Sequence, residues 1–78
     1  MRFDKSLVDT VIDRFGENIM IIPDGADRFS VSTEVSISPQ FYGWVAGFGE
    51  LAEIVAPESV RKGMESHLTK ALLRYKKD

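Results

Sequence analysis

The feature that most constrains the fold of this chain is a stretch in which apolar and polar residues alternate strictly. From Phe29 to Ile37 the odd positions are apolar or threonine, and serine or glutamate fills the positions between them. This period is typical of a β-strand with one buried face and one face in water. A continuous apolar run, Ile19 to Ile22, precedes it, and the turn sequence Pro23-Asp24-Gly25 lies between the two. The sequence therefore predicts a β-hairpin.

Three further segments repeat their apolar residues with the period of an amphipathic α-helix. Asp4 or Ser6 can cap the first of these helices, and Gly16 can end it. The three stripes are Leu7, Val8, Val11, Ile12 and Phe15; Phe41, Trp44, Val45 and Phe48; and Val60, Met64, Leu68, Ala71, Leu72 and Tyr75.

Serine and proline mark where the second and third helices begin. Ser38 can accept an orphan backbone N–H, and Pro39 fits the first helical position because it has no N–H to satisfy. We expect this helix to run to Gly49. Pro57 then opens the last helix, after the short apolar segment 51–56, which we interpret as a strand.

With residues 1–3 as the stub of a first strand, the predicted order is βαββαβ plus a C-terminal helix. This order predicts an α+β fold, a ferredoxin-like plait with an antiparallel four-stranded sheet and two helices on one face. Its first strand lies between the third and fourth, so a three-residue strand would leave neighbouring backbone groups unpaired. We therefore expect further residues upstream of Met1, with 1–78 as the C-terminal domain of a longer protein.

Composition narrows the classes of protein to consider. The chain has 78 residues, enough for one domain, and no cysteine, which fits a cytoplasmic protein without disulfides or thiolate metal sites. No apolar run approaches the length that spans a bilayer. Residues 1–56 hold four basic and nine acidic residues, whereas residues 57–78 hold six and three. We interpret the basic residues as the solvated face of the last helix.

We find no constellation that predicts catalysis, a metal or a cofactor. His67 is the only histidine, and no second histidine or cysteine stands beside it as zinc sites require. Asp9 and Asp13 lie one helical turn apart, on the side of the first helix away from its apolar stripe. The sequence therefore predicts that this chain is not an enzyme.

The densest aromatic segment is SPQFYGWVAGFGE, residues 38–50. Its stripe is expected to pack in the core, whereas Tyr42 lies off that stripe and is the best candidate for an exposed aromatic contact. Gly43 and Gly47 each cost about 1 kcal/mol relative to alanine in a helix. Either they let this helix approach another element closely, or they open a flat patch for a partner. We predict an interaction surface at Tyr42, Gly43 and Gly47.

The segment from Val35 to Tyr75 resembles the C-terminal extension domain, WCX, of the WYL family of bacterial transcription regulators. The features that carry the resemblance are a strand, a helix with a tryptophan, a Phe-Gly end, a short strand before Pro-Glu, and a final amphipathic helix closing near a tyrosine. In this sequence they are Trp44, Phe48-Gly49, Ile54-Val55, Pro57-Glu58 and Tyr75, together with Phe41, which we expect in the core.

The resemblance implies an accessory domain with a ferredoxin-like fold that helps in dimerisation or in relaying a signal between effector sensing and DNA binding. The implied partner is its own copy or the WYL domain upstream. A second hypothesis is a module that senses a small molecule or a nucleotide. A third is nucleic-acid binding by Lys70, Arg74 and Lys77. The helix that reads promoter DNA lies in another domain of such regulators, so we expect no sequence-specific DNA binding here.

Overall fold

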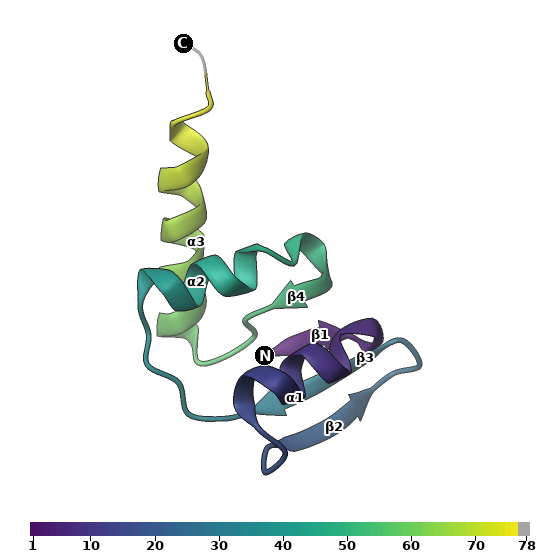
Figure 1. Cartoon of the computed structure of the whole chain (residues 1–78). Helices are drawn as coiled ribbons and strands as arrows, with labels where there is room; N and C mark the ends of the chain where they lie inside the picture. Colours follow the sequence, from purple (N-terminus) through teal and green to yellow (C-terminus); the bar gives the residue numbers. More distant parts are fainter. Residues whose placement is uncertain (77–78) are drawn as a thin grey trace.

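The computed structural model describes residues 1–76, which form a four-stranded sheet and three helices (Figure 1). The elements are β1 (Arg2–Asp4), α1 (Val8–Phe15), β2 (Met20–Asp24), β3 (Arg28–Ser32), α2 (Pro39–Ala46), β4 (Ala52–Glu53) and α3 (Glu58–Leu73). Two 3-10 turns, η1 (Lys5–Leu7) and η2 (Gly49–Leu51), precede α1 and β4. The predicted α+β class is confirmed.

The strands follow the order β2-β3-β1-β4, and every pair of neighbours is antiparallel. Strand β1 therefore lies between the third and the fourth strand, as the sequence predicted. Phe3 in its centre faces Phe29 of β3 on one side and Ala52 of β4 on the other. The shortest strand of the prediction is thus the one that joins the hairpin to the rest of the sheet.

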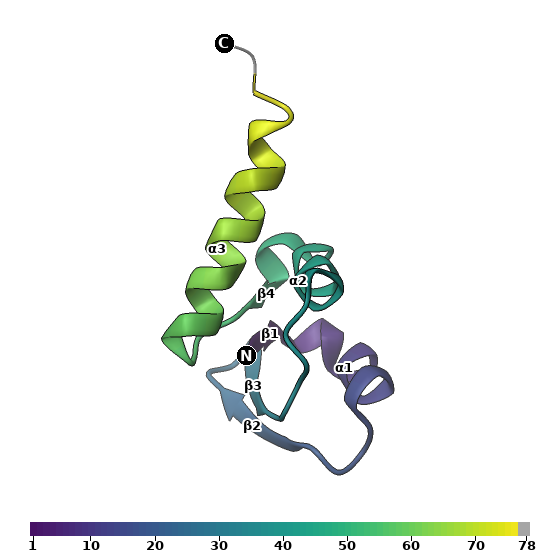
Figure 2. The ribbon, with the colours of Figure 1, turned by 90° about the vertical axis from the view of Figure 1, so that its left-hand side faces the viewer.

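Helices α1 and α2 cover the same face of this sheet (Figure 2). Phe3 and Val11 are fully buried between sheet and helix, and Phe29 stacks on Phe3 with ring centroids 5.6 Å apart. Trp44 of α2 reaches the same cluster and meets the Phe15 ring edge-on at 5.4 Å. Aromatic side chains at this spacing form the main core of the domain.

The opposite face of the sheet carries charged side chains and serines, together with the exposed side chains of Met20 and Ile22. The Arg2 Nε atom donates to the Asp24 carboxylate at 2.6 Å, and the Arg2 guanidinium lies 3.5 Å from Glu53 on the other side. The hydrogen bond and the positive charge of Arg2 lower the pKa of Asp24. Residues at alternate positions of a strand point to opposite faces, so the phenylalanine of β1 enters the core while its arginine stays with the solvated carboxylates.

The long second strand of the hairpin is shorter than predicted. Strand β3 ends at Ser32, which faces Met20 at the start of β2, and Val31 exchanges backbone hydrogen bonds with Met1. In the part of the chain that the structure describes, no strand lies on either side beyond Ser32, so the alternation that continues to Ile37 has no ladder to join. Val35 packs instead against a second cluster formed by Phe41, Val45 and Ile54.

The predicted turn at Pro23-Asp24-Gly25 is also displaced. Pro23 belongs to β2 and faces Phe29, and the reversal occupies residues 25–27, where Gly25 has a φ of +76°. Strand β2 is at the edge of the sheet, and proline is tolerated there because its missing N–H is not needed by a further strand.

The cap of α2 is as predicted, but its end is not. The Ser38 hydroxyl accepts the Phe41 N–H at 3.1 Å, whereas the helix ends at Ala46 instead of reaching Gly49, which adopts a φ of +60°. Strand β4 is only two residues long and pairs with Arg2 and Phe3 of β1. Ile54 then turns into the core, and its carbonyl accepts a side-chain N–H from Arg61 at 3.0 Å.

Helix α3 begins after Pro57 as predicted, yet none of its residues is buried. Helix α2 crosses the first half of α3, and the second half of α3 projects beyond the rest of the domain (Figures 1 and 2). Leu68, Leu72 and Tyr75 belong to the apolar stripe predicted for this helix, yet all three are exposed.

Candidate functional site

Tyr42 holds α3 against α2. Its hydroxyl donates to the Val60 carbonyl at 3.2 Å, and its ring lies 5.7 Å from the His67 ring, centroid to centroid. The side chain is therefore half-buried between the two helices, and its predicted exposure is wrong. Tyr42 thus attaches the projecting helix α3 to α2, and we call this contact the clamp.

Gly63 makes this clamp possible, and the sequence analysis missed it. A Cβ atom at Gly63 would collide with the Tyr42 hydroxyl and come within 2.9 Å of Cζ. The available signal was a glycine in the middle of a helix whose other residues favour the helical state, since such a glycine usually has a packing reason.

Gly43 and Gly47 behave differently from Gly63. Both are exposed, and a Cβ atom at Gly43 would have no neighbour within 4 Å. The account in which Gly43 permits close packing is therefore wrong. At Gly47 an added Cβ would lie 3.4 Å from the Trp44 carbonyl oxygen, which is an ordinary contact. The two glycines leave the outer side of α2 flat, and their role in binding stays a prediction.

The residues that carried the family resemblance occupy structural positions. Phe41 is buried, and Trp44 meets Phe48 edge-on at 5.0 Å. Gly49 allows the positive φ after α2, and Pro57 stands at the N-cap of α3. Tyr75 differs from these, because it lies past the end of α3 with 85% of its surface exposed.

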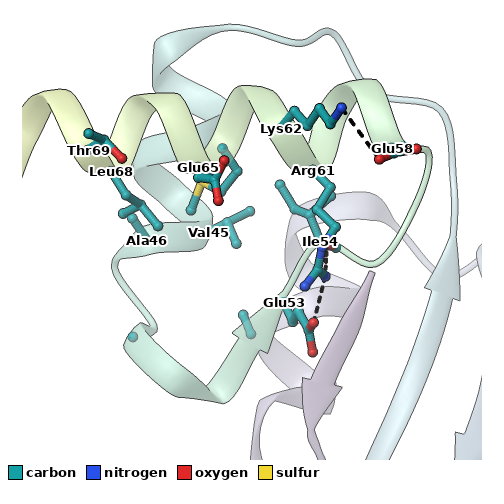
Figure 3. Close-up of a pocket in the computed structure, with 13 residues that line it drawn as sticks. Val45, Ala46, Glu53, Ile54, Glu58, Arg61, Lys62, Glu65, Leu68 and Thr69 are labelled. Atoms are coloured by element: carbon teal, nitrogen blue, oxygen red, sulfur yellow. Dashed lines mark hydrogen bonds and ion pairs between the residues drawn. The ribbon is translucent and has the colours of Figure 1, made fainter.

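A groove runs along α3 where the helix leaves the body (Figure 3). Its volume is about 590 Å³, and its walls are α3, the end of α2 and β4. The lining residues are Val45, Ala46, Gly49, Ala52, Glu53, Ile54, Glu58, Arg61, Lys62, Met64, Glu65, Leu68 and Thr69. Apolar side chains thus form its centre, and charged ones form its rim.

Two ion pairs organise that rim. Arg61 donates to the Glu53 carboxylate at 2.7 Å, which lowers the pKa of Glu53, and Lys62 lies 3.6 Å from Glu58 (Figure 3). Within residues 1–76, Glu65 forms no ion pair with another side chain. It lies on the wall of the groove that α3 provides.

An exposed apolar surface lies at the C-terminal end of α3, where the groove ends. We call residues 68–76 the α3 end; they comprise the last residues of α3 and the turn that follows it. Leu68, Leu72 and Tyr75 continue the stripe whose earlier members, Val60 and Met64, pack on the cluster around Phe41. Helix α2 crosses only the first half of α3, so among the described residues no surface lies opposite the rest of the stripe (Figures 1 and 2).

Basic side chains flank the apolar surface of the α3 end. Lys70, Arg74 and Lys76 lie in it, and residues 68–76 contain no acidic residue. Lys77, which we considered with them for nucleic-acid binding, lies outside the described residues. The arrangement is an amphipathic helix end with a positive charge, suited to contact with an acidic surface.

The remaining candidates from the sequence are apart from this site. Asp9 and Asp13 are exposed on α1, and His67 contacts Tyr42. Across residues 1–76 no three His, Cys, Asp or Glu side chains gather where they could hold a metal ion. In the same residues no helix has the length and hydropathy needed to cross a membrane.

Comparison with known proteins decides the family. The family model described as the WCX domain matches residues 1–72, nearly the whole chain. The chain belongs to the WCX domain family. No curated protein and no solved structure matches it. The resemblance noted in the sequence is therefore confirmed, and the WCX domain described here is of the type that accompanies WYL regulators as an accessory domain.

Proposed function

We propose that this WCX domain is a non-catalytic regulatory module of a WYL-type transcription regulator, built on a ferredoxin-like plait. It binds a protein surface, either its own copy or the upstream WYL domain, and so relays a signal between effector sensing and DNA binding. The family match supports the regulatory setting. Strand order and the two helices on one face support the plait.

The observation that carries the proposal is the α3 end. One apolar stripe of α3 packs on the body at Val60 and Met64 and is exposed at Leu68, Leu72 and Tyr75. Contiguous exposed apolar surface on a small domain is typical of a protein–protein contact. A projecting helix also offers this surface without rearrangement of the core.

Tyr42 has a supporting role in this proposal. Its hydrogen bond to Val60 and its contact with Gly63 set the angle at which α3 leaves the body. A movement of α2 would thus be transmitted to the α3 end by the side chain of Tyr42. The flat outer side of α2 at Gly43 and Gly47 is the surface on which such a change could begin.

Sedimentation over a wide range of protein concentrations tests the proposal, together with binding of the WCX domain to the separately produced WYL domain of the same regulator. We expect either self-association or a complex between the domains. A strict monomer that also fails to bind the WYL domain contradicts the proposed function.

The size of the groove favours a second candidate function, binding of a small effector. Its volume of about 590 Å³ lies within the range of roughly 300–1,000 Å³ that is usual for ligand sites. Arg61 is already neutralised by Glu53, which does not favour a phosphate-bearing ligand. A rise in melting temperature with a small molecule, lost in Ala46→Trp, which fills the groove from its partly exposed α2 wall, would support this function over a purely protein-binding one.

A further inference from the structure

We infer that the segment preceding Met1 in the full-length regulator binds to this domain as a continuation of strand β1, in a cleft between residues 31–37 and residues 54–57. The connection from the upstream domain is then itself part of the sheet. This inference rests on the proposed function, in which a WYL domain lies upstream. It adds the site that receives the connection and the route from that site to α3.

The cleft lies where β1 begins. It has a volume of about 490 Å³, and Met1 is one of the residues that line it. Its two sides are the segments that follow β3 and β4, which are the two neighbours of β1 in the sheet. Most of the lining is apolar, and two of its residues, Ile37 and Val55, are 46% and 41% exposed. A strand that continues β1 would therefore have a neighbour on each side and would cover apolar surface.

The backbone on both sides of the cleft lacks a strand to pair with. Residues 33–37, 55 and 56 take part in none of the backbone–backbone hydrogen bonds that residues 1–76 form. Thr33 and Val35 are nevertheless half-buried, whereas Glu34 and Ser36 are exposed. This alternation is typical of a strand with one buried face. An added strand would supply the missing partner.

The Met1 nitrogen already has the position of a strand amide. It donates to the Val31 carbonyl at 2.9 Å, and the Val31 N–H donates to the Met1 carbonyl at 2.8 Å. Such a reciprocal pair belongs to an antiparallel ladder. Burial, and to a smaller degree the charge of Arg2, lowers the pKa of the Met1 amino group. A peptide nitrogen carries no charge and makes the same hydrogen bond.

The register of β1 determines what the added strand faces. Arg2 of β1 lies opposite Ser30 of β3. In an unbroken ladder the second residue before Met1 then lies opposite Thr33, and the fourth lies opposite Val35. Both positions point to the core, because side chains alternate along a strand. We therefore expect apolar residues at these two positions and polar residues at the first and third.

Continuity with β1 selects the preceding segment as the occupant. An extended peptide from another molecule would have to end at Met1, because β1 occupies the rest of the line. The segment joined to Met1 enters the cleft without a break, and it loses less conformational freedom than a separate chain does.

A strand in the cleft would contact both helices that the clamp joins. Phe41 of α2 and Val60 of α3 line the cleft. Phe41 is the neighbour of Tyr42 in the chain, and the Val60 carbonyl accepts the hydrogen bond of Tyr42. The added strand therefore supports the attachment of α3, and its withdrawal by the upstream domain would loosen that helix.

The coding sequence gives the first test. Apolar residues at the second and fourth positions before Met1 support the inference. Charged residues at both positions, or a natural chain that starts at Met1, would overturn it.

Hydrogen exchange of single amides tests the docking directly. It compares residues 1–78 with the same domain carrying its natural upstream segment. The N–H groups of Thr33 and Val35 face the added strand and should exchange at least about tenfold more slowly when it is present. Those of Glu34 and Ser36 point away from it and should not change. Protection at none of the four positions, or equally at all of them, would overturn the inference.

The same measurement tests the route to α3. Amides in the first half of α3 should exchange more slowly when the upstream segment is present, whereas those of α1 should not change. No slowing in α3 would overturn this route.

Proline substitutions provide a matched pair. Thr33→Pro removes an N–H that faces the added strand, and Glu34→Pro removes one that points away from it. In residues 1–78 the two variants should have similar effects on the melting temperature. With the upstream segment, Thr33→Pro should melt about 4 °C or more below Glu34→Pro, because it alone loses a hydrogen bond of the ladder. An equal difference in both chains would overturn the inference.

These outcomes separate the inference from the proposed function. If the upstream segment gives no protection but the domain binds its own copy or the WYL domain, the inference is wrong and the proposed function stands. If protection is found and neither association occurs, the inference stands and the proposed function fails. Protection that increases with protein concentration would mean that a second copy occupies the cleft, which overturns the inference.

Discussion

Helices α1 and α3 carry the same kind of apolar stripe, but the stripe is packed against the sheet in α1 and largely exposed in α3. In α1 the stripe lies over the sheet, and Val11 has no exposed surface at all. In α3, a helix of twice the length, no residue is buried, and the stripe runs from Met64 against α2 to Tyr75 in solvent. The residues of an apolar stripe are therefore buried only where another surface lies opposite them, and the extent of that surface decides how many are buried.

The largest expected difference comes from deleting one apolar side chain in each region. Phe3→Ala should lower the free energy of unfolding by about 3–5 kcal/mol, because it empties a fully buried site between sheet and α1. Leu72→Ala should change it by about 0.5 kcal/mol or less when measured on the monomer. Urea denaturation followed by circular dichroism compares the two. Similar losses would show that the α3 end is packed in solution.

Two glycine substitutions should act in opposite directions. Gly63→Ala should destabilise the domain by about 1–2 kcal/mol, because the new methyl group displaces Tyr42 and this outweighs the gain in helix propensity. Gly43→Ala meets nothing within 4 Å and should stabilise it by about 0.5–1 kcal/mol. Thermal unfolding of both variants gives the signs, and a stabilising Gly63→Ala would contradict the clamp between α2 and α3.

A subtler change isolates the hydrogen bond of that clamp. Tyr42→Phe keeps the ring against His67 but removes the donor to the Val60 carbonyl, which should cost about 0.5–1.5 kcal/mol. Hydrogen exchange should quicken in α3 and stay unchanged in α1. Faster exchange throughout the domain would mean that Tyr42 supports the core and not the attachment of α3 in particular.

The smallest effect concerns pH. Hydrogen bonding by Arg2 lowers the pKa of Asp24, and hydrogen bonding by Arg61 lowers that of Glu53, from ordinary values of 3.8 and 4.5. A carboxyl whose pKa is lower in the folded state stabilises it above its unfolded pKa, and this contribution disappears as the pH falls through the folded pKa. Melting temperature should therefore decrease below a pH of about 4.5.

The control for this effect is Arg2→Gln. It removes the partner of Asp24 and should flatten the decrease in melting temperature without abolishing it, because Arg61 still pairs with Glu53. Both pairs are partly exposed, so the change should be small and should shrink further in salt. An unchanged profile in Arg2→Gln would show that Asp24 does not contribute.

Elements with local causes were predictable from the sequence. Ser38 and Pro39 begin α2 because a hydroxyl and a missing N–H suit a helix start, whatever surrounds them. Helix α1 and the hairpin of β2 and β3 likewise follow from the spacing of apolar residues, which repeat about every 3.6 residues in the helix and every second residue in β3. The candidate site was predictable only in part: a flat patch at Gly43 was one of two alternatives, Tyr42 was expected to be exposed, and Gly63 was overlooked.

Elements that depend on a neighbour could not be read from the sequence. Val35 and Ile37 continue the alternation of β3, but they are not in a strand, because no strand within residues 1–76 lies beside them. Strand β4 has only two of the six residues in the predicted segment 51–56. Backbone hydrogen bonds in a sheet require two neighbouring strands, and the local sequence pattern of one strand does not show whether the other is present.

The amino-acid order alone settled the class of fold, the starts of α2 and α3 and the membership in the WCX family, because these rest on spacing along the chain; Asp4 caps the turn η1 and not α1. Tertiary structure alone decided that Tyr42 holds α3 against α2 and that the last four of the six residues in the α3 stripe stay in solvent. The physical reason is that burial is a property of two surfaces in contact, and α2 crosses only the first half of α3 (Figures 1 and 2).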